Sequence, residues 1–190
     1  MTWSEPVQLI KEMEDGTLDN AYDVYVENDK IYVTWQDATR VITEEEDVLS
    51  AMNAMSVRLV QFDTETDTVT ENKCLTQNAG YYMYPCTVAA GGESYTAYVH
   101  NLLDSGDVLG NNTQHLYCIK GTENEAEEIA LPEKAQIVNM DGGIFEGEAS
   151  VVCELDLDGD ITTDTDREIY AYSMQSEKSY RLSDNSVVDT

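Results

Sequence analysis

The stretch Ile31-Tyr32-Val33-Thr34-Trp35-Gln36-Asp37 is mostly β-branched or aromatic, a composition typical of a β-strand. Two later stretches have the same character, Tyr95-Thr96-Ala97-Tyr98-Val99-His100-Asn101 and Ser150-Val151-Val152-Cys153-Glu154-Leu155-Asp156, and each likewise ends in Asp or Asn. One strand that recurs three times along the chain indicates an internal repeat, and this repeat decides the fold.

Each copy contains three further strand candidates, which recur in the same order. They lie over 21–27, 57–63 and 69–75 in the first copy, over 81–89, 114–120 and 127–131 in the second, and over 136–140, 168–174 and 179–182 in the third. Turn residues typical of β-hairpins separate the first two strands of each copy: Asn28-Asp29, Gly91-Gly92 and Gly142-Gly143. The sequence therefore predicts an all-β chain of three four-stranded antiparallel units, repeated every 55 to 64 residues.

One short inserted helix near 44–55 is expected between the second and third strands of the first copy. Thr43 and Glu46 have the spacing of a capping box, in which both side chains satisfy free amides at a helix start. Apolar residues then follow at helical spacing: Val48, Leu49, Met52 and Met55. We expect the methionines to serve packing rather than to hold a cofactor.

Radial repetition in a β-propeller suits a four-stranded antiparallel unit that recurs with so little helix. The units would be blades over 21–77, 78–134 and 135–190, after a lead-in outer strand over 1–20. Propellers typically have at least four blades, so three would form a partial β-propeller that belongs to a longer protein or assembles with copies of itself. The alternative fold is a β-sandwich of two sheets built from the same strands.

Two short motifs carry a resemblance to a known family. Trp3-Ser4-Glu5-Pro6-Val7 and Tyr32-Val33-Thr34-Trp35-Gln36 are similar to the Trp-Ser-x-Pro-Val lead and the Tyr-Val-x-Trp-Gln strand of sialidase-like propeller repeats in large bacterial surface proteins. The resemblance implies a secreted or surface-displayed bacterial protein. It does not carry over the catalytic residues of the family's enzymes, because the Asp-box turn is absent and the arginines that the chemistry needs are scattered. These are Arg40, Arg58, Arg167 and Arg181.

The charge of the chain excludes several classes of partner. Its 38 acidic and 10 basic residues give a formal net charge of −28. Such a surface repels phosphate backbones and anionic lipids, so we expect no nucleic-acid binding. No apolar run approaches the roughly 20 residues that span a bilayer, so we expect no membrane insertion.

The cysteines leave two interpretations open. Cys74, Cys86, Cys118 and Cys153 form no CxxC pair, so a structural zinc site is not expected. Their even number permits two disulfides. We favour the second interpretation, in which they are small buried thiols on strands.

An acidic stretch follows the last copy of the repeated strand and is the main candidate for a metal site. It offers the alternating carboxylates that calcium requires: Asp156, Asp158, Asp160, Asp164 and Asp166. An EF-hand would need Gly at the position of Ile161 and Glu at the position of Arg167, and it would need flanking helices, so that motif is excluded. An irregular calcium loop and a solvated acidic hairpin remain open.

The two histidines give a second, weaker metal candidate. If Asn101 pairs with Gln114 in the sheet, His100 faces His115 across the ladder, with Asp104 and Asp107 in the intervening loop. Two imidazoles and a carboxylate could bind a transition metal. The alternative is a pair of surface imidazoles.

The connections between the second and third strands are long in all three copies and strongly acidic. Besides the Asp-rich stretch, they contain Glu44, Glu45, Glu46, Asp47, Asp104 and Asp107. Long loops on a rigid scaffold commonly carry binding function, so we expect these loops to form an acidic face.

These observations predict a non-catalytic binding or structural propeller segment of an extracellular or cell-surface protein. Its partner would be a protein or a glycan, and its end blades could self-associate. Two alternatives stay open: part of a glycan-acting, sialidase-like enzyme, and a calcium-stabilised spacer module.

Overall fold

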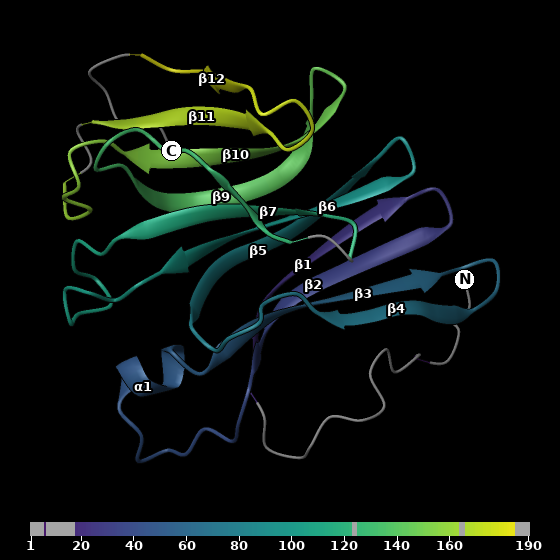
Figure 1. Ribbon diagram of the computed structural model, residues 1–190, viewed down its shortest axis with the longest axis horizontal. Helices are drawn as coiled ribbons and strands as arrows, with labels where there is room; N and C mark the ends of the chain where they lie inside the picture. The colour runs from purple at the N-terminus through teal and green to yellow at the C-terminus, as the bar shows by residue number, and fades with distance from the viewer. Residues whose placement is uncertain (1–5, 7–17, 123–124, 164–165, 185–190) are drawn as a thin grey trace.

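The computed structural model describes residues 6, 18–122, 125–163 and 166–184, and within these the chain forms three four-stranded antiparallel sheets (Figure 1). Sheet 1 contains β1 (Asp19–Glu27), β2 (Lys30–Ala38), β3 (Met55–Asp63) and β4 (Thr68–Cys74). Sheet 2 contains β5 (Tyr81–Ala90), β6 (Glu93–Asn101), β7 (Gln114–Lys120) and β8 (Glu127–Ile129). Sheet 3 contains β9 (Gln136–Phe145), β10 (Glu148–Asp156), β11 (Arg167–Ser173) and β12 (Ser179–Arg181). The all-β class and the three four-stranded units are confirmed.

The three sheets share one connectivity, in which each strand pairs with its neighbours in the sequence. The first hairpin of each sheet closes through two residues, because Glu27 pairs with Lys30, Ala90 with Glu93 and Phe145 with Glu148. The predicted lead-in strand at Trp3 to Leu9 lies outside the described residues, apart from Pro6.

Sheet 2 lies between the other two sheets and packs on both. The largest buried apolar cluster joins it to sheet 3, where Tyr95, Ala97 and Val99 lie together with Val151 and Leu155. Its other face packs on sheet 1 through two smaller clusters. There the Thr34 hydroxyl lies 2.5 Å from the Thr87 hydroxyl, which in turn lies 2.8 Å from the Thr96 hydroxyl. Polar atoms buried between the sheets are thereby paired with one another.

The first strands of the three sheets lie next to one another, and each carries a bulge. The ladder shifts between Asn20 and Asp23 in β1, between Met83 and Cys86 in β5, and opposite Glu154 in β9. The Tyr84 hydroxyl at the second bulge donates to the Val138 carbonyl at the third, at 2.6 Å. In Figure 1, β4 and β12 lie at the outer borders of the molecule. The bulges therefore recur at similar distances from the hairpin turns, and the Tyr84 hydrogen bond links the second bulge to the third.

The prediction of a turn at Gly142-Gly143 is wrong. Both glycines lie inside β9, and the hairpin turns at Glu146 and Gly147, which have φ of 51° and 83°. A Cβ at Gly142 would lie 2.8 Å from a Val88 methyl group and 3.2 Å from the Cys86 sulfur. This glycine therefore allows β9 to approach β5 closely.

The predicted helix is present but shorter and differently capped. It is α1 (Val48–Met52), and its N-cap is Asp47, whose carboxylate accepts from the Ser50 N–H at 3.0 Å. The capping box at Thr43 and Glu46 is wrong, because Glu46 forms an ion pair with Arg40 instead. The two oxygens of Asp47 bind both the amide and the hydroxyl of Ser50, which fixes the start of the helix there.

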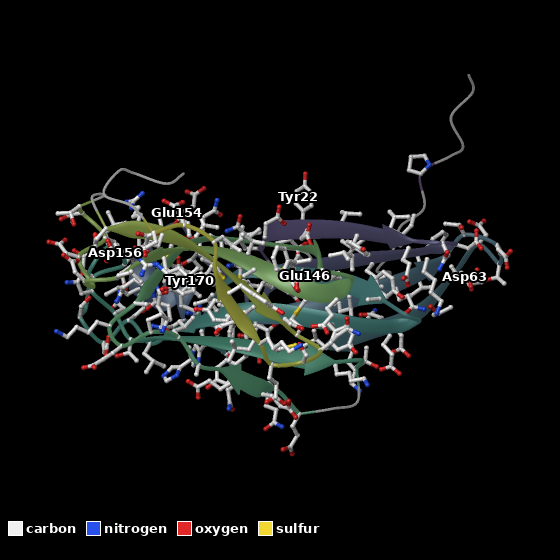
Figure 2. All side chains as sticks on the ribbon, turned by 90° about the horizontal axis from the view of Figure 1, so that it is seen from above. Tyr22, Asp63, Glu146, Glu154, Asp156 and Tyr170 are labelled. Carbon is white, nitrogen blue, oxygen red and sulfur yellow. The ribbon has the colours of Figure 1, made fainter. Side chains whose placement is uncertain are left out.

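The long connections gather at one end of the molecule and the short hairpin turns at the other. In Figure 1 the segment with α1, the loop over 102–113 and the loop over 157–163 all lie at the left. Figure 2 shows Asp156 at this end and Asp63, the last residue of β3 before the turn to β4, at the opposite end. The scaffold thus presents its loops together.

Candidate metal centre

Three carboxylates converge where β10 ends and its loop begins. The ligand oxygens of Asp156, Asp158 and Asp166 lie within 4.8 Å of one another, and they form the only such group of three or more metal-ligating side chains in the described part of the chain. Asp156 is the last residue of β10 and has 0% exposure, whereas Asp158 is exposed. The site therefore has a buried base and an open rim.

Each aspartate of this trio uses an oxygen to hold the loop. The Gly159 N–H donates to Asp156 Oδ1 at 2.9 Å, the Asp160 N–H to Asp158 Oδ1 at 2.7 Å, and the Asp158 N–H to Asp166 Oδ2 at 2.8 Å. These bonds fold the backbone around the carboxylates, so the second oxygens are left for another partner.

Two of those second oxygens are buried and unpaired. Asp156 Oδ2 and Asp166 Oδ1 have no hydrogen-bond partner although both atoms are shielded from solvent. A buried oxygen without a donor or cation costs free energy. Burial, with the nearby charges of Asp166 and Asp158, raises the pKa of the Asp156 carboxyl above its ordinary value, although the Gly159 N–H opposes this. The three carboxylates could therefore hold a cation.

The neighbouring arginine does not neutralise the trio. Arg167 stands opposite Asp156 in the ladder, yet its guanidinium forms an ion pair with Glu154 at 3.0 Å. Its second terminal nitrogen donates to the Ile161 carbonyl at 3.3 Å, and its Nε is buried without a partner. The charge of Arg167 lowers the pKa of Asp156, but less than burial and the neighbouring aspartates raise it, so the three carboxylates are not neutralised by this arginine.

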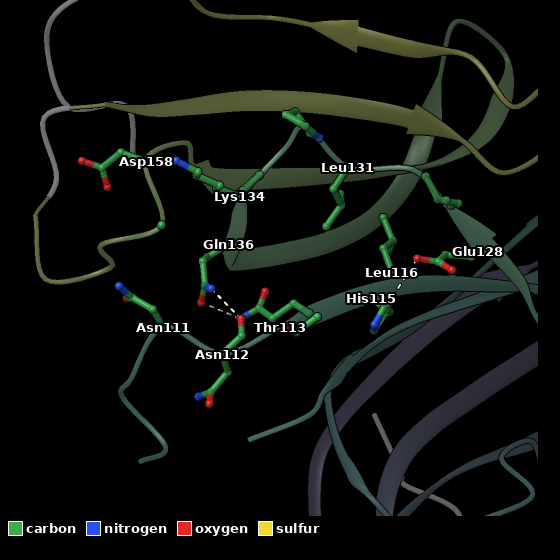
Figure 3. A pocket seen from close by; sticks show the side chains of 15 residues that line it. Asn111, Asn112, Thr113, His115, Leu116, Glu128, Leu131, Lys134, Gln136 and Asp158 are labelled. Carbon is green, nitrogen blue, oxygen red and sulfur yellow. Dashed lines mark hydrogen bonds and ion pairs between the residues drawn. The ribbon is translucent and has the colours of Figure 1, made fainter. Parts of the chain in front are cut away.

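A groove of about 520 Å³ runs beside the trio, between sheets 2 and 3. Figure 3 shows Asp158 and Lys134 at the same end of this groove. A Cβ at Gly159 would lie 3.2 Å from the Lys134 carbonyl oxygen, so the loop packs against the connection between β8 and β9. Gln136 donates to the Asn112 carbonyl at 2.5 Å across the groove floor. A change in the conformation of this loop would therefore alter the shape of the groove.

The structure brings together three of the five predicted calcium ligands. Asp160 turns away from the trio, because its carboxylate accepts from the amide and the hydroxyl of Thr162 at 3.1 and 2.5 Å. Asp164 lies outside the described residues.

The predicted histidine pair is confirmed as a pair, and no carboxylate from its loop joins it. His100 faces His115 in the ladder. His115 Nδ1 lies 2.7 Å from Glu128 on β8, while His100 stacks on Tyr82 with ring centres 4.8 Å apart. Asp104 instead binds the amide and hydroxyl of Thr113. In the described residues these imidazoles belong to no group of three ligands within reach of one metal.

The other acidic loop residues have separate roles. Asp47 caps α1, Glu46 pairs with Arg40, and Asp107 accepts from the Leu109 N–H at 3.0 Å. Glu44 and Glu45 are exposed. They contribute negative charge to the loop end of the molecule without forming a second cluster of ligands among the described residues.

The arginines do not converge on a pocket. Arg58 pairs with Asp37 in sheet 1, and Arg181 pairs with Glu168 in sheet 3. Arg40 and Arg167 form the ion pairs described above, so each of the four guanidinium groups pairs with a different carboxylate. The cysteines are all free, but the expectation of four buried thiols is wrong for Cys74, which is exposed near the edge of sheet 1 on β4. Burial raises the pKa of the Cys118 and Cys153 thiols to about 12.

Sequence reasoning missed the groove and its polar floor. Asn112 and Gln136 are buried amides outside any motif, and only their place next to strand ends could have marked them.

Comparison with known proteins adds no relative: no protein-family model and no curated protein sequence matches the chain. In the described residues, no helix is long and apolar enough to cross a membrane.

Proposed function

We propose that this protein is a non-catalytic, calcium-binding module of propeller-like sheets that serves binding or architecture. The observation that carries the proposal is the buried, unpaired Oδ2 of Asp156 among the carboxylates of Asp158 and Asp166. A calcium ion there would balance their charge and give the unpaired oxygens a partner.

The chemistry of the donor set favours calcium over softer metals. Calcium takes about six to eight oxygen ligands in flexible geometry, and carboxylates supply them. The trio offers oxygens only, whereas zinc or copper would prefer nitrogen or sulfur ligands. The loop supplies three carboxylates from one hairpin, and water or backbone carbonyls would complete the shell.

The arrangement as propeller blades is part of the proposal. It is supported by three sheets of one connectivity, by bulges in their first strands at similar distances from the hairpin turns, and by the proximity of those strands. Propeller blades are four-stranded antiparallel sheets grouped around an axis, with their first strands innermost. An arc of three such sheets fits this description better than a two-sheet sandwich.

A binding or structural role is favoured over glycan-acting chemistry by the scattered, ion-paired arginines. The groove beside Asp158 is the surface where a protein or glycan partner would bind, because it combines amides, an ammonium group and the rim of the metal loop. An extracellular or cell-surface setting suits the site, because calcium sites of extracellular modules bind at about 10⁻⁴ to 10⁻³ M.

The test is thermal unfolding with and without calcium. At a calcium concentration about 100 times the Kd, binding stabilises the folded state by about 2.7 kcal/mol, so the melting temperature of the wild type should rise by several degrees. The variants Asp158→Asn and Asp166→Asn should lose most of this rise, because each removes one ligand charge.

The matched control is Asp104→Asn, which removes one negative charge from the corresponding loop of sheet 2. This variant should keep the full calcium response. A rise of equal size in all four proteins would show that calcium acts on the overall charge rather than at the trio. No rise in the wild type at about 5 mM calcium would refute the calcium site.

A further inference from the structure

The three sheets pack on one another in a single sense. Counted from the two-residue hairpin turn, the third residue of the second strand is Tyr32 in sheet 1 and Tyr95 in sheet 2, and each packs against the next sheet. The fourth residue is Thr96 in sheet 2 and Val151 in sheet 3, and each faces the preceding sheet. Call the face that carries the third residue the first kind, and the face that carries the fourth residue the second kind. Each contact between sheets thus joins a face of the first kind to a face of the second kind on the next sheet.

The first sheet has a face of the second kind that no sheet of the described residues covers. We call it the start face. Two rows of paired residues cross it, and they are mostly apolar: Val26, Ile31, Phe62 and Val69, then Val24, Val33, Val60 and Asn72. Val24 and Val26 are 50% and 60% exposed, and Tyr22, which points away from the molecule in Figure 2, is 79% exposed. Val60 and Phe62 in the middle of these rows are only 0% and 9% exposed, so the exposed apolar surface of the start face lies along β1. Exposed apolar surface of this kind marks an interaction site.

The third sheet keeps a face of the first kind, which we call the end face. Asp141, Val152, Ala171 and Tyr180 form a row across it, in which Asp141 is exposed and Ala171 is buried. Beside them Phe145 contacts the Tyr180 ring with centres 5.3 Å apart, and Val152 is 36% exposed. The end face therefore also offers aliphatic and aromatic side chains to a partner.

We propose that the start face of one copy packs against the end face of a second copy, and that two copies close into a ring of six sheets. This pairing repeats the relation that joins sheet 1 to sheet 2 and sheet 2 to sheet 3. Six blades fall within the usual range for propellers, about four to eight. Because the contact is between unlike faces, it either closes into a ring or extends into a filament.

A second copy is the occupant because each copy supplies both faces that the internal contacts join. Pairing two start faces would leave both end faces exposed and would repeat no contact seen within the chain. The proposal rests on the fan-like packing of the sheets and not on the calcium site. Its failure would therefore leave the calcium titration informative.

The experiment is sedimentation velocity on the whole chain at about 1 to 100 µM. The expected species is a dimer, and the dimer should strengthen as NaCl rises from about 0.05 to 0.5 M, because salt screens the repulsion between chains of charge −28. Val26→Asp on the start face and Val152→Asp on the end face should each weaken dimerisation about 100-fold. Val41→Asp, at an exposed position in the connection after β2, is the matched control and should not.

Mixing the two face variants separates the possible contacts. Val152→Asp keeps an unaltered start face, and Val26→Asp keeps an unaltered end face. These two faces can still pack together, so the mixture should form heterodimers although neither variant dimerises alone. Circular dichroism of each variant checks that it is folded. A wild type that stays monomeric at all concentrations, or that grows into filaments, would overturn the ring. A dimer that Val152→Asp leaves unchanged would overturn the pairing of unlike faces.

Discussion

The loops that follow β6 and β10 occupy corresponding places in sheets 2 and 3 but differ in how their buried polar groups are paired. Counted from the hairpin turns, Asn101 and Asp156 are equivalent, and both are buried at the end of their strands. Each accepts from a loop N–H at 2.9 Å, from Leu103 and from Gly159 respectively. One residue is a neutral amide and the other is a carboxylate.

The loop of sheet 2 closes on itself through a buried amide. Asn112 accepts from the amide and hydroxyl of Ser105 and donates to the carbonyls of Asp107 and Gly110, at 2.8 to 3.0 Å. The loop of sheet 3 has no such residue among its described positions and leaves two carboxylate oxygens unpaired. The difference teaches that one loop pairs its buried polar atoms within the protein, while the other leaves two carboxylate oxygens that the proposed calcium ion would bind.

The largest expected effect breaks the self-contained loop. Asn112→Ala removes four hydrogen bonds and leaves buried partners unsatisfied, so it should lower the free energy of unfolding by about 2–4 kcal/mol. The loss should be the same with calcium and with a chelator, as measured by denaturant unfolding. Asn111→Ala, at the exposed neighbouring position, should change stability by less than about 0.5 kcal/mol. Equal losses for both variants would show that Asn112 does not close the loop.

The next effect makes the two loops alike. Asp156→Asn places in sheet 3 the residue that sheet 2 has at the equivalent position. Without calcium it should raise the free energy of unfolding by about 1 kcal/mol at pH 7, because it removes a buried charge next to two others. With calcium it should be the less stable protein, because it has lost a ligand. A variant that is less stable than the wild type even in chelator would contradict a carboxylate that is strained without its cation.

The pH dependence sharpens the same comparison. Burial and neighbouring charge raise the pKa of Asp156 in the folded state above that in the unfolded chain. The folded state therefore takes up this proton more readily, and the resulting stabilisation is present at low pH and is lost as pH rises through the raised pKa. In chelator, the advantage of Asp156→Asn over the wild type should shrink as pH falls from 7 to about 4. Melting curves at several pH values check this, and a constant difference would rule it out.

The smallest expected effect tests whether Asp160 is one of the calcium ligands. Asp160 serves only the turn at Thr162, so Asp160→Asn should change the calcium Kd by no more than about 3-fold. Calorimetric titration measures the change. A loss as large as that of Asp158→Asn would place Asp160 among the ligands.

Sequence reasoning located the strands well, because each short strand ends near a turn signal and the signals recur. It located the His100–His115 pair for the same reason, since the ends of β6 and β7 fix the register. It failed at Gly142, because a glycine can mark either a turn or a close approach of two strands, and only the packing of β9 on β5 decides which. It did not separate Asp160 from Asp156, Asp158 and Asp166, because spacing along a loop does not reveal which carboxylates converge.

The most direct test of the calcium site is equilibrium dialysis against calcium at about 0.15 M KCl, where salt screens weak binding to the acidic surface. Bound calcium per chain is measured for the wild type and for Asp156→Asn. The wild type should bind one ion more than the variant at saturation, in the concentration range that stabilises it against heat. Equal binding by the two proteins would contradict a calcium ion held at the end of β10.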